Sequence, residues 1–334
     1  MMAEDARLVQ LQSWLSSVLD NSNLQIEPAS ADASFRRYFR ASHAGETWIV
    51  MDAPPEKEDC KPFIRVAEAL LPLGLHVPEI LQSDLDQGFL LLSDLGSQSY
   101  LDVLNDENVQ RLYGDAMGAL LILQACGPGA DSLPPYDETL LRREMELFRE
   151  WYLKRHLGLE LSGTEQDMFD RVFTHLAVSA LEQPRVAVHR DYHSRNLMLS
   201  DAHNPGILDF QDAVFGPVTY DLVSLLRDCY IRWPRSQVEN WVLGYHELAT
   251  QSGILQSVAE EQFLGWFDRM GVQRHLKATG IFARLHHRDN KPGYLQDIPR
   301  TLSYVRDVSA RYAELQPLYD FLQQKVMPQL ESAE

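Results

Sequence analysis

The sequence predicts an α+β protein with two lobes, a small β-rich lobe over residues 1–94 and a larger, mainly helical lobe over residues 95–334. The chain has 334 residues, and at roughly 150 residues per domain this length favours two cores over one. Short β-branched or aromatic runs separated by turn residues gather in the first part. Apolar side chains at helical spacing dominate the second part, so the two patterns divide the chain.

The first lobe is predicted to hold a small sheet and a helix. Residues 35–40 and 48–51 are rich in strand-forming types and flank a connection that contains glycine, which predicts a hairpin. Apolar side chains recur at helical spacing over residues 62–71, and a proline and a glycine then end this pattern. Residues 88–96 form an apolar run that ends in turn residues, which predicts a buried strand at the lobe boundary.

The second lobe is predicted to be helical with one exception. An apolar stripe over residues 107–124 is typical of an amphipathic helix, and helical patterns continue after it. Three short apolar runs then alternate with polar connections that contain Asn, Gly and Pro. These runs, at residues 186–188, 197–199 and 207–210, predict strands among the helices.

The residues that carry chemistry lie between and after these runs. His189, Asp191 and Asn196 follow the first run in the order H-x-D-x-x-x-x-N, and Asp209 lies in the third. This spacing is typical of phosphoryl transfer, in which Asp191 would orient an acceptor hydroxyl and accept its proton. Asn196 and Asp209 would hold Mg²⁺ across the phosphates. Singly, such residues often only satisfy turns, but their joint spacing between apolar strands favours catalysis.

The segment from His189 to Asn196, taken with Asp209, resembles the aminoglycoside phosphotransferase and choline kinase branch of the protein-kinase-like fold. The likeness covers essentially the whole chain and implies a bilobal kinase that uses ATP. It implies that backbone groups of a hinge at Asp94 and Leu95 grip the adenine. Asp221, at the start of an apolar helix, resembles the buried acid that braces the catalytic loop by accepting its backbone N–H groups, although a plain helix N-cap is the alternative.

A closer resemblance is to the bacterial anomeric kinases of N-acetylmuramate and N-acetylglucosamine, carried by residues 34–40, 88–96 and 273–284. It implies an ATP-dependent kinase that phosphorylates the sugar at C1 in the recycling of peptidoglycan, the cell-wall polymer.

Two departures from the kinase pattern concern the nucleotide. A loop of small residues that ends at Ser34 stands in place of a glycine-rich loop, and its small side chains still allow a backbone to approach phosphates. The strand at residues 48–52 lacks the lysine that kinases place there. We therefore predict that an arginine among Arg36, Arg37 and Arg40 contacts the phosphates. The alternative for each is a solvated surface charge.

The candidate substrate residues follow the catalytic segment. Tyr230 and Trp233 could stack on a sugar ring, although helical aromatic residues more often pack in a core. Arg274, His275 and Lys277 are cations within about one helical turn of one another in an acidic chain. A carboxylate or an acyl amide would use them.

Composition excludes several classes of protein. Lys and Arg number 30 against 48 for Asp and Glu, and the net charge of −18 disfavours nucleic acids and anionic membranes. The longest stretch without a charged residue, 116–130, is too short to span a bilayer. Cys60, Cys126 and Cys229 lack close spacing, which suits a reducing compartment and argues against a zinc site. With an acidic N-terminal start unlike an export signal, these features predict a cytoplasmic enzyme without an obligate protein partner.

Two alternatives remain open at this point. An acidic chain could instead act on a cationic acceptor, as an aminoglycoside- or choline-type kinase does. The missing strand lysine could also indicate a pseudokinase that binds nucleotide or serves as a scaffold without turnover. Against the pseudokinase, Asp191, Asn196 and Asp209 are all present, and a module freed from catalysis has no physical need of all three.

Overall fold

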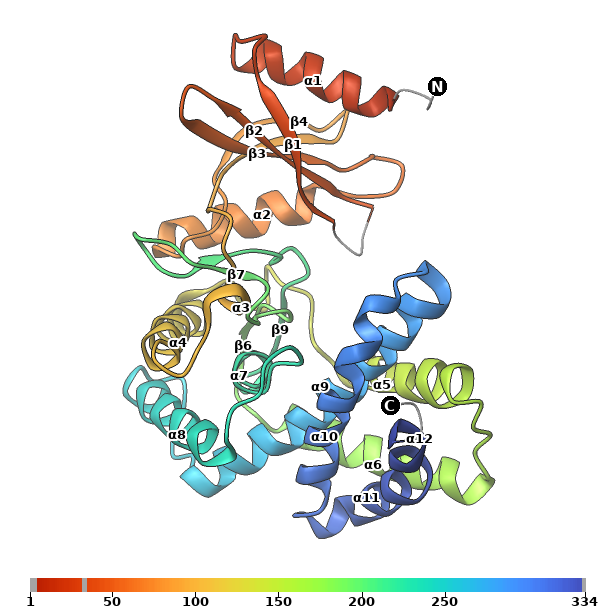
Figure 1. Cartoon of the computed structure of the whole chain (residues 1–334). Coiled ribbons are helices and arrows are strands. Elements are labelled where there is room, and N and C mark those ends of the chain that lie inside the picture. The colour runs from red at the N-terminus through yellow and green to blue at the C-terminus, as the bar shows by residue number, and fades with distance from the viewer. Residues whose placement is uncertain (1–4, 32–34, 332–334) are drawn as a thin grey trace. The chain divides into compact units, whose positions relative to one another are not determined.

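The computed structural model describes residues 5–31 and 35–331 and divides into two compact units (Figure 1). The first unit comprises Met1–Gln98 and Met198–Asp212, and the second comprises Ser99–Leu197 and Ala213–Glu334. An antiparallel sheet in the N-terminal part and a mostly helical remainder confirm the predicted fold class. The functional division at residue 94 stays a prediction. In the ranges that the structure describes, no helix has both the length and the apolar character that a membrane span requires.

The first unit is built on a five-stranded sheet with the order β1-β2-β3-β5-β4, in which neighbouring strands run antiparallel. Its helices α1 and α2 lie on opposite faces of this sheet (Figure 1). Its elements are α1 Ala6–Val18, β1 Gln25–Ala31, β2 Arg37–His43, β3 Glu46–Asp52, α2 Lys61–Leu70, η1 Leu71–Leu73, β4 Ile80–Asp84, β5 Phe89–Ser93 and β8 Gly206–Ile207. The short strand β7 Leu197–Met198 pairs with β8.

The core of the first unit forms where helix α1 meets the sheet. Leu11 and Leu15 are fully buried on α1 and pack against Phe39, Val50 and Leu91 of the central strands. These five apolar side chains are removed from water, and each fully buried one contributes about 1.5–3 kcal/mol. The predicted hairpin is confirmed as β2 and β3, which are joined by a tight turn.

The second unit is mainly helical and adds one two-stranded sheet, β6 with β9. Its helices α3–α6 are Tyr100–Val103, Val109–Cys126, Glu138–Leu147 and Gly163–Leu181, with the π-helix η2 Phe148–His156 after α5. Its strands are β6 Arg185–Val188 and β9 Val214–Pro217. The later elements are α7 Tyr220–Leu226, α8 Arg235–Gln251, α9 Glu260–Asp289, η3 Pro292–Asp297, α10 Ile298–Ser309, η4 Ala313–Leu315, α11 Gln316–Phe321, η5 Leu322–Val326 and α12 Met327–Glu331.

Helix α9, 30 residues long, organises the second unit. It packs against α5, η2, α6, α7 and α10. Leu276 and Phe282 of this helix are buried in the same apolar cluster as Phe148 of η2 and Phe169 of α6. The segment that carries the candidate substrate cations is therefore a central helix, which fixes their positions.

The close packing of α9 predicts a strong effect of one substitution. A Cβ atom at Gly280 would lie 2.3 Å from the carbonyl carbon of Leu147 and 2.6 Å from the amide nitrogen of Phe148. Because these are backbone atoms at the junction of α5 and η2, Gly280→Ala should lower the free energy of unfolding by about 1–3 kcal/mol or more. The melting temperature should fall by roughly 2–4 °C for each kcal/mol of lost stability.

The matched control is Gly244→Ala, in the middle of α8. A Cβ atom there meets nothing within 4 Å, so the change should leave the melting temperature unchanged or raise it slightly through higher helix propensity. Equal melting temperatures for the two variants would contradict the close approach of α9 to Leu147.

Candidate active site

The catalytic segment of the second unit begins where strand β6 ends. His189 and Arg190 follow this strand, and Arg190 has a φ of 78°, in the left-handed region. Asp221, fully buried on α7, holds this turn: its Oδ2 accepts a hydrogen bond from the His189 N–H at 2.6 Å and its Oδ1 from the Arg190 N–H at 2.9 Å. Burial raises the pKa of Asp221 to about 7, although both N–H groups act to lower it. The predicted bracing role of Asp221 is confirmed.

A second acid braces the other end of the segment. The Oδ2 of buried Asp228 accepts hydrogen bonds from the Ser194 N–H at 2.9 Å and from the Ser194 hydroxyl at 2.5 Å. Its Oδ1 accepts from the Tyr230 N–H at 2.9 Å. The sequence pattern does not predict a role for Asp228. The only signal is a pair of ionisable residues, Arg227 and Asp228, at the end of the mostly apolar run that follows Asp221.

The environment of Asp191 keeps its carboxyl group ionised. Burial alone would raise the pKa of Asp191, but the positive charges of Lys277, His193, Arg274 and Arg190 outweigh burial and hold the pKa below its usual value. The structure therefore brings two of the predicted substrate cations, Lys277 and Arg274, into electrostatic range of the predicted base. A carboxylate that is ionised at neutral pH can accept a proton from a hydroxyl group.

The predicted metal ligands have the chemistry that Mg²⁺ requires. The Asn196 Nδ2 donates a hydrogen bond to the Asp191 carbonyl at 2.9 Å, which orients the amide so that its oxygen is the atom that a metal would use. Asp209, in the first unit, has a φ of 65° and accepts a hydrogen bond from the Gln211 Nε2 at 2.6 Å. Over residues 5–31 and 35–331, no group of three or more His, Cys, Asp and Glu side chains could enclose a metal ion. An amide oxygen and a carboxylate are ligand types that Mg²⁺ accepts, and the role of Asn196 and Asp209 in binding it stays a prediction.

Glu144 of helix α5 is a further residue at this site, and the sequence pattern does not predict it. It is 4% exposed, and it accepts hydrogen bonds from Arg190 at 2.5 Å and from the Lys277 ammonium at 3.1 Å, as well as from the Tyr136 hydroxyl. Lys277 also donates to the Tyr220 hydroxyl at 2.8 Å. Burial alone would raise the pKa of Glu144, but Lys277 and Arg190 hold it below its usual value. The charge of Lys277 is thus balanced within the protein.

Arg274 differs from Lys277 in having no carboxylate partner within the described chain. Its side chain is buried, its Nη1 lies 3.7 Å from the Cys229 Sγ, and its Nε has no hydrogen-bond partner. The charges of Asp191 and Asp228 act on Arg274, but neither carboxylate forms an ion pair with it, so its buried N–H groups lose hydration without full compensation. This arrangement suits a residue whose anionic partner is a ligand.

Two other predicted substrate residues are engaged in packing. The His275 Nε2 lies 2.7 Å from the Arg227 carbonyl oxygen, and its ring stacks on Tyr304. Trp233 is 8% exposed and donates a hydrogen bond from its indole to the Tyr113 hydroxyl at 3.0 Å. Their contact with a substrate stays a prediction. Tyr230, in contrast, is only partly buried and remains a candidate for stacking.

The candidate nucleotide arginines all have acidic partners in the first unit. Arg37 donates to the buried Asp52 from its Nε at 2.9 Å. Arg40 donates to both carboxylate oxygens of Asp94, at 2.7 and 3.0 Å, and to the Gly96 carbonyl at 2.8 Å. These bonds fix the backbone of the predicted hinge, where Leu95 is buried beside Asp94. Arg40 thus shapes the hinge.

Arg36 makes an ion pair with Glu58 at 3.1 Å. Glu58 also accepts the backbone N–H of Phe35 at 3.1 Å, so it holds the chain directly after residues 32–34. Ser34, the other predicted phosphate contact, lies outside the described residues.

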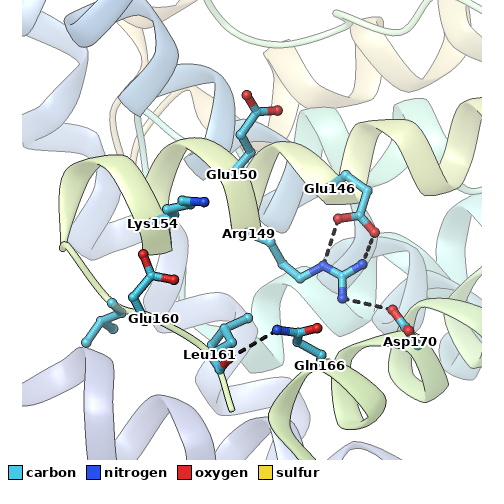
Figure 2. Close-up of a pocket in the computed structure, with 9 residues that line it drawn as sticks. Glu146, Arg149, Glu150, Lys154, Glu160, Leu161, Gln166 and Asp170 are labelled. Atoms are coloured by element: carbon cyan, nitrogen blue, oxygen red, sulfur yellow. Dashed lines mark hydrogen bonds and ion pairs between the residues drawn. The ribbon is translucent and has the colours of Figure 1, made fainter. Parts of the chain in front are cut away.

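A hollow in the second unit contains none of these residues. Figure 2 shows that its lining is mainly charged and comes from α5, η2, α6 and the connection between them. In this hollow Arg149 donates hydrogen bonds to Glu146, from its Nε at 2.7 Å, and to Asp170, from its Nη1 at 2.8 Å. Gln166 donates to the Leu161 carbonyl at 3.1 Å. The polar groups of Arg149, Glu146, Asp170 and Gln166 are therefore bonded within the protein.

Comparison with known proteins agrees with this geometry. The chain is 50% identical to the N-acetylmuramate/N-acetylglucosamine kinase of Pseudomonas aeruginosa over 331 residues, which cover 96% of this chain and 97% of the relative. It is 44% identical to the protein of the same name from Neisseria meningitidis over 322 residues, which cover 95% of each chain.

Two solved structures share the fold. An ethanolamine kinase of Plasmodium vivax has a TM-score of 0.64 at 10% identity and covers 88% of this chain and 86% of its own. An ADP-bound aminoglycoside phosphotransferase has a TM-score of 0.59 at 15% identity and covers 91% of this chain and 99% of its own. The family model of phosphotransferase enzymes matches residues 25–259. With relatives this similar along nearly its whole length, the chain belongs to the phosphotransferase enzyme family.

Proposed function

We propose that this enzyme transfers the γ-phosphoryl group of ATP to the anomeric hydroxyl of N-acetylmuramate and N-acetylglucosamine. The observation that carries the proposal is the 44–50% identity, along nearly the whole chain, to relatives that bear the name of a kinase of these two sugars. Both sugars are building blocks of peptidoglycan, so the activity would serve its recycling. Because the reaction consumes ATP and the cysteines are free thiols, we place it in the cytoplasm.

The proposed mechanism uses Asp191 as the base. Its carboxylate accepts the proton of the anomeric hydroxyl as the oxygen bonds to the γ-phosphorus of ATP, and ADP leaves. The braces at Asp221 and Asp228 hold the segment that carries this base. Asn196 and Asp209 would hold Mg²⁺, which when bound neutralises charge on the phosphate oxygens.

We assign the nucleotide to the first unit. The hinge backbone at Asp94 and Leu95 would bind the adenine, with Arg40 as the residue that fixes its shape. Among the arginines we favour Arg36 for the phosphates. Its partner Glu58 also accepts the N–H of Phe35, directly after residues 32–34.

Single alanine variants of the three arginines separate these roles. Loss of Arg36 should raise the KM for ATP, whereas loss of Arg37 or Arg40 should mainly lower the melting temperature, since a buried carboxylate loses one of its partners.

We assign the lactyl carboxylate of N-acetylmuramate to Arg274. A charge-assisted hydrogen bond contributes about 1.5–3 kcal/mol, so Arg274→Gln should lower kcat/KM for N-acetylmuramate by roughly 10-fold to 100-fold relative to N-acetylglucosamine, which lacks this carboxylate. Equal losses for the two sugars would place the carboxylate elsewhere.

The decisive experiment concerns the acceptor oxygen. The two free sugars should be phosphorylated, and phosphorus NMR should show the phosphate on O1. Their methyl glycosides, which differ only in a capped anomeric oxygen, should not react. A kinase acting on O3 or O6 would still accept the glycosides. Turnover of kanamycin in preference to both sugars would instead support an aminoglycoside kinase.

A further inference from the structure

Asp297, at the end of η3, is a buried acid with one oxygen in use and one without a partner. The side chain is 8% exposed, and its Oδ1 accepts a hydrogen bond from the Arg300 Nη1 at 3.0 Å. Its Oδ2 is buried and accepts no hydrogen bond from the described chain. Buried polar atoms are nearly always hydrogen-bonded in folded proteins, so an unpaired oxygen such as this one needs an explanation, and a bound ligand is one.

The same region offers hydrogen-bond donors beside this acceptor. Arg195, in the catalytic segment, lies with its guanidinium carbon 3.7 Å from the ring centre of Tyr230 and 5.6 Å from that of Tyr294. Within the described residues this guanidinium makes neither an ion pair nor a hydrogen bond. Burial raises the pKa of Asp297, and the charge of Arg195 is close enough to oppose this rise in part. A donor and an acceptor thus lie near each other without bonding.

An apolar surface adjoins this pair. The ring of Tyr294 stacks on buried Phe282 at 5.6 Å between ring centres, and Phe282 in turn contacts Tyr230 at 6.3 Å. Tyr230 and Tyr294 are only partly buried. A ligand can therefore reach two aromatic rings, which suit a small apolar group such as a methyl.

These groups lie beside the catalytic segment. Tyr230 packs edge-on against His193, whose charge acts on Asp191. Arg300 ties Asp297 to the same neighbourhood, because its Nη1 also donates to the carbonyl of residue 229 at 2.8 Å.

We propose that Asp297 and Arg195 form the subsite for the acetamido group of the acceptor sugar. An amide carries an N–H donor and a carbonyl acceptor on adjacent atoms: its N–H would donate to Asp297 Oδ2, and its carbonyl would accept from Arg195. Its methyl group would lie against Tyr230 and Tyr294. The inference rests on the proposed function, since the acetamido group is on C2, next to the anomeric carbon, and its subsite must lie close to the base.

The test compares N-acetylglucosamine with glucose, which has a hydroxyl in place of the acetamido group. Wild-type enzyme should bind N-acetylglucosamine more tightly, as measured by calorimetry without ATP. In Asp297→Asn, an amide can still accept from Arg300 but presents an N–H₂ to the ligand. We expect the dissociation constant for N-acetylglucosamine to rise by roughly 10-fold to 100-fold, while that for glucose changes less than 3-fold.

The matched control is Asp307→Asn, ten residues further on and in the adjoining helix α10, where the carboxylate pairs with Arg232 and Arg306. It should leave both dissociation constants unchanged. Tyr294→Leu provides a second variant that does not alter the buried acid, and it should weaken the binding of N-acetylglucosamine several-fold without affecting glucose.

Unchanged binding of N-acetylglucosamine in folded Asp297→Asn would overturn the subsite. An equal loss for glucose would also overturn it, because Asp297 would then bind a ring hydroxyl. If Asp297→Asn fails to fold, the dissociation constants of Tyr294→Leu for the two sugars test the subsite instead, and an unchanged value for N-acetylglucosamine would overturn it. Failure of the proposed function is a separate result, in which the wild-type enzyme neither binds nor phosphorylates either N-acetyl sugar, and the subsite is then withdrawn with it.

Discussion

Asp191→Asn should lower kcat by roughly 10²–10⁴, the usual contribution of a general base, while the affinity for ATP stays within a few-fold. The change removes the proton acceptor but keeps the size of the side chain. Asn196 should hold its orientation, because it bonds to the backbone carbonyl of residue 191 rather than to the side chain. Steady-state kinetics with both sugars, together with nucleotide titration, measure the two quantities.

The control for this prediction is Asp170→Asn, an acid on α6 that pairs with Arg149 outside the catalytic segment. Its kcat should match the wild type. Near-normal turnover in Asp191→Asn would remove Asp191 from the role of base, whatever the identity of the acceptor. A large rise in the dissociation constant of ATP would instead show that the substitution disturbs the nucleotide site.

Central elements of the fold could be predicted from the sequence, whereas edge elements could not. Strand β5 has four consecutive buried apolar residues, so its pattern is plain. The missed strands β1 and β4 are the two edges of the sheet. β1 contains Pro28, which cannot donate to a ladder, and β4 contains the polar run Gln82, Ser83 and Asp84. Edge strands bury less surface and so leave a weaker pattern.

The same distinction applies to the candidate site. A catalytic segment is contiguous in sequence, so its spacing reveals it. Glu144 bonds to Arg190, 46 residues later, and Asp228 bonds to Ser194, 34 residues earlier. The local sequence around each acid does not identify such a distant partner. The cations of α9 could be recognised as an unusual cluster. Lys277 forms an ion pair with a buried acid and Arg274 does not. This difference depends on tertiary packing and could not be predicted.

Asp209→Ala should weaken ATP binding and abolish phosphoryl transfer together. The predicted role of Asp209 is to give Mg²⁺ a charged oxygen, and without the metal the negative phosphates are neither oriented nor neutralised. Its left-handed backbone and its bond from Gln211 fix the carboxylate. Asp212, three residues on, is exposed and serves as the comparison.

Asp212→Ala should therefore be the milder change, with turnover within about tenfold of the wild type. Single-turnover assays at several magnesium concentrations separate the two acids. Loss of a metal ligand should raise the magnesium requirement in Asp209→Ala, whereas loss of a surface charge should not do so in Asp212→Ala. Equal losses at both positions, or a larger loss at Asp212, would show that Asp209 is not the metal ligand.

Because alanine at residue 209 must also adopt a φ near 65°, the variant Asp209→Asn is measured alongside Asp209→Ala. Asparagine tolerates this conformation and keeps an oxygen ligand without the charge. Partial recovery of turnover at high magnesium in Asp209→Asn alone would show that the charge, rather than the backbone, sets the affinity for the metal.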